Sequence, residues 1–298
     1  MTVPMKASPM KNVIRSGEAA SGPFSLEITP ATAGWQFSGL RVLELSAGQV
    51  ESVDTGDTEV VVLSLGGSAD VTVDDRAFAL VGRATVFAGP SDVVYAPRDA
   101  RLTLTSAEGG RFALASAVCH ARLEPAYLPA ADVPVEMRGA GPSSRQVNNF
   151  GVPGVLDAVN IIACEVLTPG GNWSSYPPHK HDEEREGETR LEEIYYFEVA
   201  DGPAGPGIGF QRVYGHDDAE IDVSAEVRSG DAVLIPHGWH GPSIAAPGYD
   251  LYYLNVMAGP GDERAWLICD DPAHTWIRDT WADQPVDPRL PFGKDVSA

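Results

Sequence analysis

Short apolar runs alternate with polar turn residues along most of the chain, and these runs have the length of strands. From Phe24 onward, segments such as LRVLEL, EVVVLSL and DVVYAP are rich in valine and leucine and are bounded by glycine, aspartate, proline or serine. A second series follows, with VNIIACEVL, EEIYYFEV, DAVLIP and YDLYYLNVM. Many short strands without helical periodicity between them predict an all-β sandwich or barrel.

Turn-rich and proline-rich stretches divide the chain into five parts. Residues 1–22 are polar and are expected to form an N-terminal arm. Residues 23–123 and residues 149–269 each hold one series of strands, and each is predicted to form one β-module. Residues 124–148 contain four prolines and are interpreted as a connection between the modules. Residues 270–298 show no clear period and are expected to wrap over a module or an oligomer interface.

The second module holds a group of residues suited to binding a metal ion. His179 and His181 stand two apart in YPPHKHD, and alternate residues of a strand point to one face, so the two imidazoles would lie side by side. Glu193 opens the aromatic run EIYYF, and His240 follows the turn residues of PHGWH. Three imidazoles and one carboxylate suit Zn(II), Mn(II), Fe(II) or Ni(II).

These stretches resemble a known family. G-x5-P-x-G-x-H from Gly230 to His240 is similar to the second cupin motif, and H-x-H followed by Glu193 is similar to the first, with a longer interval before the glutamate. The words YPPHKHD, LEEIYYF, PHGWHG and APGYDLYYLNVMAGP together resemble the 5-deoxy-glucuronate isomerases of inositol catabolism, in the bicupin group that includes 5-keto-4-deoxyuronate isomerase. The resemblance implies two cupin barrels (double-stranded β-helix or jelly-roll) in one chain. It also implies a divalent metal, with Zn or Mn favoured, on His179, His181, Glu193 and His240.

Three further residues have two interpretations each. Glu192 is a rival ligand that would face away from Glu193, and the family's pattern favours Glu193 because it directly precedes the aromatic strand. Tyr253 would point into the barrel, either as a hydrogen-bond donor or proton relay to the substrate or as a core tyrosine bonded to backbone. Arg212 is the predicted ligand of a substrate carboxylate, because guanidinium binds carboxylate through two parallel bonds, or it is a surface arginine of a strand.

The two modules look like weak internal repeats. TEVVVLSLGGSADV in the first parallels LEEIYYFEVADGPAG in the second, which sets Glu59 opposite Glu193. VYAPRDAR likewise parallels LIPHGWH, so that Arg101 stands where His240 does. No H-x-H precedes Glu59, and a cationic arginine cannot ligate a divalent ion. The first module is therefore expected to be a metal-free barrel that serves packing and assembly.

The resemblance implies an aldose–ketose isomerisation of 5-deoxy-D-glucuronate to 2-deoxy-5-keto-D-gluconate, with no net redox change and no organic cofactor. Two other functions use the same barrel. A cupin dioxygenase would hold Fe, Cu or Ni on these ligands and activate oxygen, whereas a sugar-binding or regulatory cupin would bind without turnover. The polar, charged site region favours an acidic sugar over an apolar aromatic substrate.

Composition narrows the partners. Lys and Arg number 21 against 42 Asp and Glu, a net charge of −21, which argues against nucleic acid or an anionic membrane as a partner. Three scattered cysteines fit the reduced thiols of a cytosol, and no apolar run approaches transmembrane length. A cytoplasmic homo-oligomer acting on a small acidic sugar is expected, and such a substrate would need a local basic residue.

Overall fold

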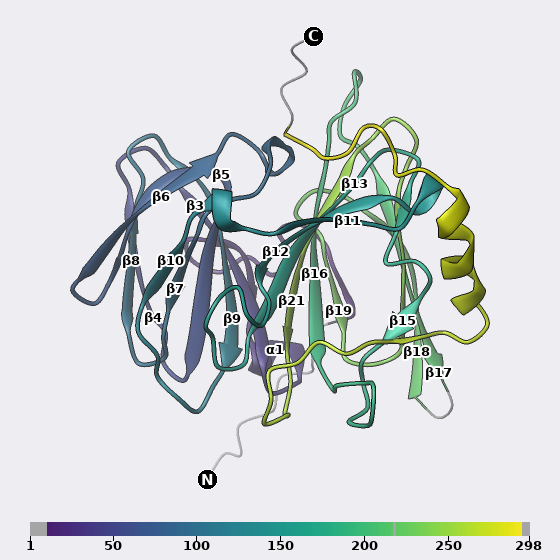
Figure 1. Ribbon diagram of the computed structural model, residues 1–298. Coiled ribbons are helices and arrows are strands. Elements are labelled where there is room, and N and C mark those ends of the chain that lie inside the picture. Colours follow the sequence, from purple (N-terminus) through teal and green to yellow (C-terminus); the bar gives the residue numbers. More distant parts are fainter. Residues whose placement is uncertain (1–10, 217–218, 294–298) are drawn as a thin grey trace.

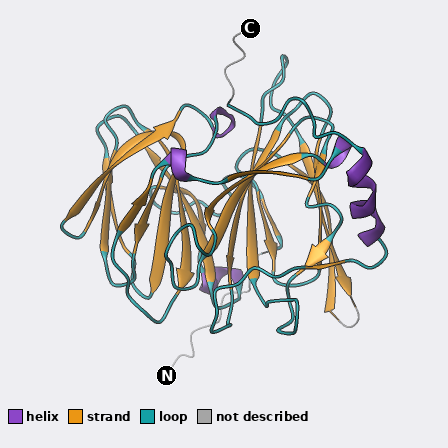
Figure 2. Cartoon of the chain, viewed as in Figure 1, coloured by secondary structure: helices purple, strands orange, loops and turns teal. Residues whose placement is uncertain are grey.

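The protein consists of two β-barrels that lie side by side, with short helical turns between strands (Figures 1 and 2). The computed structural model describes residues 11–216 and 219–293. The all-β prediction is confirmed: two separate series of strands form the two barrels, as the alternation of apolar runs and turns predicts.

The first barrel is one strongly curved sheet of nine strands. Its longest strand, β5, bends around the barrel and pairs in turn with β9, β7, β6 and β8. Irregular pairing near Gly66 and Gly67 in β5 allows that bend. The strands are β2 (Phe24–Ile28), β3 (Ser38–Leu45), β4 (Val50–Asp54), β5 (Thr58–Val73), β6 (Arg76–Arg83), β7 (Val93–Ala96), β8 (Arg101–Thr105), β9 (Gly110–Val118) and β10 (Ala126–Leu128).

The second barrel is built from two sheets. The seven-stranded sheet contains β1 (Val13–Ile14), β11 (Val135–Arg138), β12 (Arg145–Gly151), β13 (Ile162–Thr168), β16 (Glu192–Val199), β19 (Ala232–Ile235) and β21 (Leu251–Ala258). The six-stranded sheet contains β14 (Trp173–Ser174), β15 (His179–Lys180), β17 (Gly209–His216), β18 (Ala219–Val227), β20 (Trp239–Ala245) and β22 (Cys269–Asp270). The helical turns are α1 (Pro30–Ala33), η1 (Val86–Ala88), η2 (Ala130–Asp132), η3 (Gly141–Ser143) and η4 (Thr275–Asp283).

The barrels pack against each other through the outer faces of their sheets. Alternation along β5 sends Val60 and Val62 into the first barrel, whereas Val61 and Leu63 face the second. On the other side, Ile194 and other outward-facing residues of β16 and β21 join the same apolar cluster. Each such side chain that leaves water contributes about 1.5–3 kcal/mol. The first barrel therefore covers a sheet face that the second barrel would otherwise expose.

Two carboxylates, buried Glu59 and half-buried Glu192, tie the barrels together reciprocally. Glu59 of the first barrel accepts hydrogen bonds from three consecutive backbone N–H groups of the second, those of residues 159–161, at 2.8, 2.6 and 2.7 Å. Glu192 of the second barrel accepts three from residues 36–38 of the first, at 2.8, 2.7 and 3.0 Å. Hydrogen bonds to an ionised acceptor are stronger than neutral ones, so these contacts fix how the barrels dock.

The connecting segments contribute strands of their own. In the part predicted as an arm, residues 13–14 form β1 and pair with β19 of the second barrel, while residues 1–10 lie outside the described residues. In the part predicted as a connection, residues 126–128 form β10 on the edge of the first barrel, and residues 135–148 supply β11 and most of β12 to the second. The tail runs along the second barrel and carries η4 on its outer side (Figure 1).

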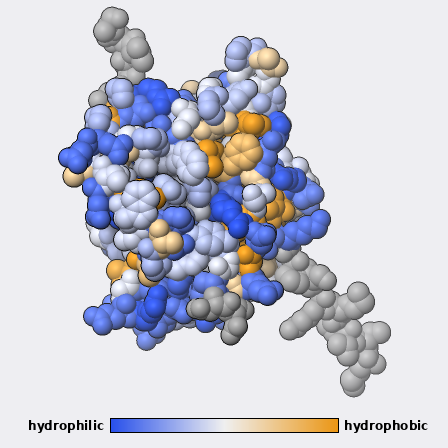
Figure 3. Space-filling model, turned by 90° about the vertical axis from the view of Figure 1, so that its right-hand side faces the viewer, coloured by the Kyte–Doolittle hydropathy of each residue, from blue (hydrophilic) through white to orange (hydrophobic). Residues whose placement is uncertain are grey.

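The surface at the second-barrel end of the molecule is mainly hydrophilic, with hydrophobic side chains gathered in one area (Figure 3). This agrees with the net charge of −21. None of the described helices is long and apolar enough to cross a membrane.

Candidate metal centre

The candidate ligands come from both sheets of the second barrel. Glu193 is the second residue of β16 in the seven-stranded sheet, where it pairs with Ile235 and Met257 on the neighbouring strands. His179 and His240 are direct partners on β15 and β20 of the six-stranded sheet, and His181 follows β15. The four residues therefore face one another across the interior of the barrel.

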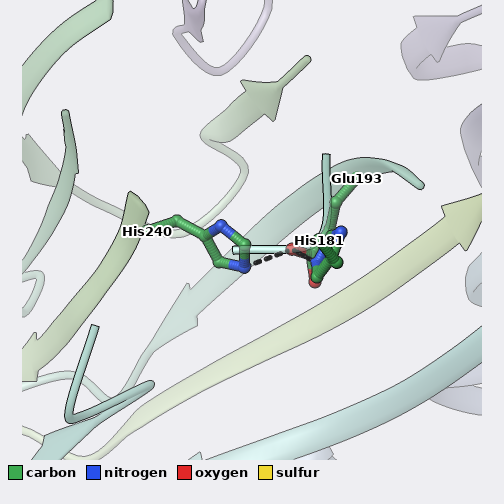
Figure 4. A group of neighbouring side chains, drawn as sticks. All are labelled: His181, Glu193 and His240. Atoms are coloured by element: carbon green, nitrogen blue, oxygen red, sulfur yellow. Dashed lines mark hydrogen bonds and ion pairs between the residues drawn. The ribbon is translucent and has the colours of Figure 1, made fainter. Parts of the chain in front are cut away.

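Three of these side chains form one compact buried group. Nε2 of His181 and Nε2 of His240 each lie 3.1 Å from the same oxygen of Glu193, Oε2 (Figure 4). One potential ligand atom from each residue lies within 4.8 Å of the others, and all three residues are almost fully buried. The arrangement has the donor types and the spacing of a metal site.

His179 lies beside this group. Its ring centroid is 4.4 Å from that of His240 and 6.3 Å from that of His181. It is buried and lines the same cavity as Glu193, but it falls outside the set of three whose ligand atoms lie within 4.8 Å of one another. The structure thus brings the four predicted residues together, with three in closer contact than the fourth.

The hydrogen bonds of the histidines fit a cation. His240 Nδ1 lies 3.1 Å from the carbonyl oxygen of Gly238, so in the neutral ring Nδ1 carries the proton and Nε2 offers a lone pair. That Nε2 is buried, faces the Glu193 carboxylate and makes no hydrogen bond of acceptable geometry with any described residue. His181 Nδ1 is also buried without a partner among the described residues. His240 Nε2 and the Glu193 carboxylate oxygen are thus two acceptors that face each other in a site shielded from water. Such a pair requires a positive charge between its members.

The protonation states of His179, Glu193 and His181 also fit the binding of a cation. Burial, together with neighbouring His240 and His181, holds the pKa of His179 well below its usual value, so this imidazole is neutral. Burial opposes ionisation of Glu193, but the neighbouring His240 and His181 outweigh it and lower the pKa to about 2. Metal ligation requires neutral imidazole and ionised carboxylate. Burial also opposes protonation of His181, but its hydrogen bond to Glu193 raises the pKa, and a bound cation would replace that proton.

A second set of polar groups supports the site. Asn255 donates a short hydrogen bond to the other oxygen of Glu193, which fixes the carboxylate. The hydroxyl of Ser175 lies 3.0 Å from the hydroxyls of both Tyr195 and Tyr253. Tyr253 is buried inside the barrel, its hydroxyl bonds this serine hydroxyl, and burial raises its pKa to about 12.

The site opens into a cavity of about 390 Å³. Its lining includes His179, Glu193, Tyr195, Tyr253 and Asn255. The lining also includes three cations and two large aromatic side chains from β11, β12, the segment before β22, and η4: Arg138, Arg145, Trp266, Arg278 and Trp281.

Arg212 does not belong to this cavity. On β17, Gln211 and Val213 are buried and Val213 packs with Tyr195 and Tyr253, so Arg212 faces the other way. Its guanidinium donates to the carboxylate of Asp222 and to the carbonyl oxygen of Val213, at 2.9 Å for the latter. The position contradicts the prediction that Arg212 binds a substrate carboxylate. The alternation of inward and outward residues along the strand could have indicated that Arg212 faces outward. The sequence did not indicate the cationic residues of the cavity, because they come from the segment interpreted as a connection and from the tail.

The register of the sheets also corrects the internal repeat. Val60 pairs with Ala96, which precedes Pro97, whereas Glu193 pairs with Ile235, which precedes Pro236. Val60 therefore occupies the position of Glu193, and a slip of one residue moves a side chain to the opposite face.

The corrected register has two consequences for the first barrel. Glu59 corresponds to Glu192, and both face the partner barrel. Arg101, at the position of His240, is exposed and pairs with Asp54 at 2.8 Å. The first barrel thus lacks the carboxylate as well as the histidines.

Sequence comparisons identify close relatives. The model of the KduI/IolB family matches residues 12–277. The 5-deoxy-glucuronate isomerase of Geobacillus kaustophilus is 38% identical over 260 residues, which cover 86% of this chain and 91% of that protein. The enzyme of the same name from Bacillus subtilis (strain 168) is 36% identical over 254 residues, with 84% of this chain and 91% of that protein covered.

Solved structures agree with this fold. An IolB-like protein from Salmonella typhimurium LT2 superposes with a TM-score of 0.82 at 33% identity and covers 90% of this chain and 99% of its own. Oxalate decarboxylase from Lactobacillus farciminis has a TM-score of 0.62 at 12% identity, with 89% of both chains covered. Oxalate decarboxylase from Bacillus subtilis, described with Mn(II) centres, has a TM-score of 0.55 at 14% identity and covers 82% of this chain and 74% of its own. The oxalate decarboxylases share the fold, whereas the match over residues 12–277 and the 36–38% identities show that the chain belongs to the KduI/IolB family.

Proposed function

We propose that the chain is a metal-dependent aldose–ketose isomerase that converts 5-deoxy-D-glucuronate to 2-deoxy-5-keto-D-gluconate in inositol catabolism. The observation that carries this proposal is the buried group of His181, Glu193 and His240, of which Glu193 lines the cavity, in a chain whose relatives are 5-deoxy-glucuronate isomerases. The second barrel holds the active site, and the first barrel supports it.

The metal would be held by His181, Glu193 and His240, with His179 as the fourth ligand. A mixed set of imidazoles and a carboxylate suits Zn(II) or Mn(II), and Mn(II) centres are described for an oxalate decarboxylase of the same fold. When bound, the cation would polarise the substrate carbonyl and stabilise the negative charge that develops on oxygen. Asn255 keeps the Glu193 carboxylate oriented through its hydrogen bond.

The reaction moves hydrogen from the carbon beside the aldehyde to the aldehyde carbon, so a protein hydroxyl near the reacting oxygens is useful. Tyr253 fits this role because burial raises its pKa to about 12, which keeps the phenol protonated at neutral pH and able to donate a hydrogen bond. Ser175 lies between Tyr253 and Tyr195, at 3.0 Å from each, so a proton can pass along three connected hydroxyl groups. Tyr253 is therefore assigned as donor or proton relay.

An anaerobic conversion experiment tests the function. Purified full-length protein, supplied with Mn(II) or Zn(II), is incubated without oxygen with 5-deoxy-D-glucuronate, and the products are followed by NMR. The expected result is conversion to the keto acid without oxygen. Oxygen uptake without isomerisation would instead indicate a cupin dioxygenase, and binding without conversion would indicate a non-catalytic sugar-binding cupin.

A further inference from the structure

The cavity beside the metal group, as we call His181, Glu193 and His240, has a cationic end, although the whole chain is strongly acidic. Arg138 on β11 and Arg145 on β12 are direct partners across the two strands, and Arg278 reaches the same cavity from η4 of the tail. Three guanidinium groups therefore line one cavity of a chain with a net charge of −21.

The three arginines differ in their partners. Nε of Arg138 pairs with Glu136 at 2.9 Å, and Nη2 of Arg278 pairs with Asp270 at 2.7 Å. Arg145 pairs with no carboxylate among the described residues: its Nη1 donates only to the carbonyl oxygens of Ser143 and Tyr176, at 3.2 and 3.4 Å. Arg145 is also the most buried of the three, at 7% exposed. A buried guanidinium without a directly paired carboxylate is costly, so an anion bound at this position would stabilise it.

Arg145 remains charged and is linked through the neighbouring backbone to the hydroxyls of Ser175, Tyr195 and Tyr253. Burial lowers its pKa to about 10, which still leaves the guanidinium protonated at neutral pH. The Arg145 guanidinium donates to the carbonyl oxygen of Tyr176. The preceding residue is Ser175, and the Ser175 hydroxyl bonds the hydroxyls of Tyr253 and Tyr195. The Tyr195 ring lies 6.1 Å from that of His240. The cavity wall thus runs from the metal group past the hydroxyls to Arg145.

The tail completes the environment of Arg145. The guanidinium carbon lies 5.7 Å from the ring centroid of Trp281, within the range of a cation–π contact. The same ring lies 5.2 Å from the guanidinium carbon of Arg278. Nε1 of Trp281 is shielded from solvent and has no acceptor among the described residues, so the wall beside Arg145 contains an unsatisfied donor.

Resting on the proposed function, we propose that Arg145 binds the carboxylate of the substrate and so directs the opposite, aldehyde end to the metal group. The carboxylate and the aldehyde of 5-deoxy-D-glucuronate stand at the two ends of a six-carbon chain. Arg145 on β12 and Glu193 on β16 line the same cavity from strands that are separated in the sheet by β13 and β21. Guanidinium offers two parallel hydrogen bonds to a carboxylate. Arg145 is thereby a specificity-determining residue for aldehyde sugars that carry a carboxylate at the far end.

Substitution R145Q tests the assignment. We measure kcat/KM for 5-deoxy-D-glucuronate and for the neutral aldose 5-deoxy-D-glucose, which has a hydroxymethyl group in place of the carboxylate. In R145Q, kcat/KM for the acid should fall about 100-fold or more, with little change for the neutral sugar and no loss of metal. R212Q is the matched control, because Arg212 pairs with Asp222 outside the cavity, and it should retain the wild-type preference. Unchanged preference for the acid in R145Q would overturn the assignment.

Two further measurements separate the possible failures. R145K keeps the charge without the planar guanidinium fork, so its kcat/KM for the acid should lie between the values of wild type and R145Q. It replaces R145Q if that variant does not fold. If R145Q does not fold and R145K has the wild-type kcat/KM for the acid, the assignment is overturned. Binding of the acid is followed by saturation-transfer NMR, which does not depend on turnover. Binding by wild type without conversion, lost in R145Q, would contradict the proposed function while supporting the role of Arg145.

Discussion

The two barrels share one fold but have opposite interiors. The interior of the first is filled by aliphatic and aromatic side chains, with Val60, Val62 and Leu104 among them. The interior of the second also contains buried His181, Glu193 and further polar groups, and it keeps a cavity. The contrast shows that the barrel supplies only a scaffold, and that function depends on a few inward-facing positions.

The same contrast appears at one pair of strand positions. The first barrel has Glu59 followed by Val60, and the second has Glu192 followed by Glu193. In each barrel the first residue of the pair faces outward and binds three backbone N–H groups of the other barrel. Only the second barrel carries a carboxylate at the inward position. A shift of one residue along the strand reverses the direction of the side chain, so it separates a docking contact from a proposed metal ligand.

The largest effect is expected from removing the first barrel. Deletion of residues 1–120 should give insoluble protein, because it exposes the apolar outer faces of β16 and β21 and removes β1 from the edge of β19. Solubility after expression and gel filtration measure the outcome. A soluble fragment with full isomerase activity would show that the first barrel is dispensable.

The next effect concerns the metal ligands. His240→Ala should lose bound metal and lower isomerase activity at least about 1,000-fold, since Lewis-acid stabilisation is worth several kcal/mol. His237→Ala is the matched control: this histidine lies three residues earlier, and its imidazole contacts the carbonyl oxygen of Glu220 at 3.3 Å outside the cavity. His237→Ala should keep metal and activity. Full metal occupancy in His240→Ala would contradict the ligand assignment.

A smaller effect separates docking from metal binding. Glu59→Gln should lower the free energy of unfolding by about 2–4 kcal/mol, because a neutral amide accepts the three backbone N–H groups of residues 159–161 less well than a carboxylate does. Metal content should stay unchanged. Glu193→Gln should show the reverse pattern, with loss of metal as the main result. Denaturant unfolding measures the change in stability of both variants, and elemental analysis measures their metal content. Metal loss in Glu59→Gln would contradict the proposed division of roles between the two glutamates.

The sequence predicted those features that depend on local alternation. The strand series, the inward face of Glu193 and the interior position of Tyr253 follow from the two-residue period, and the structure has them. Features that depend on long-range pairing were missed. The repeat was aligned one residue out because Glu59 and Glu193 look alike in sequence, and only the pairing with Ala96 and Ile235 distinguishes them.

The cationic end of the cavity could not be predicted for a similar reason. Arg145 stands three residues after a proline, in a segment whose composition indicates a connection, yet residues 145–151 form a fully buried strand. Whether an arginine meets a carboxylate depends on tertiary packing, which gave Arg212 the partner Asp222 and left Arg145 with backbone carbonyls. Residue type alone does not distinguish these two outcomes.

The metal content of the full-length protein tests the central claim most directly. The account places one metal site in the second barrel and none in the first, so elemental analysis of protein purified without chelator should give about one metal ion per chain. The same measurement on His181→Ala should give a value near zero. Two metal ions per chain, or a His181→Ala protein that retains its full complement, would contradict the difference between the barrels.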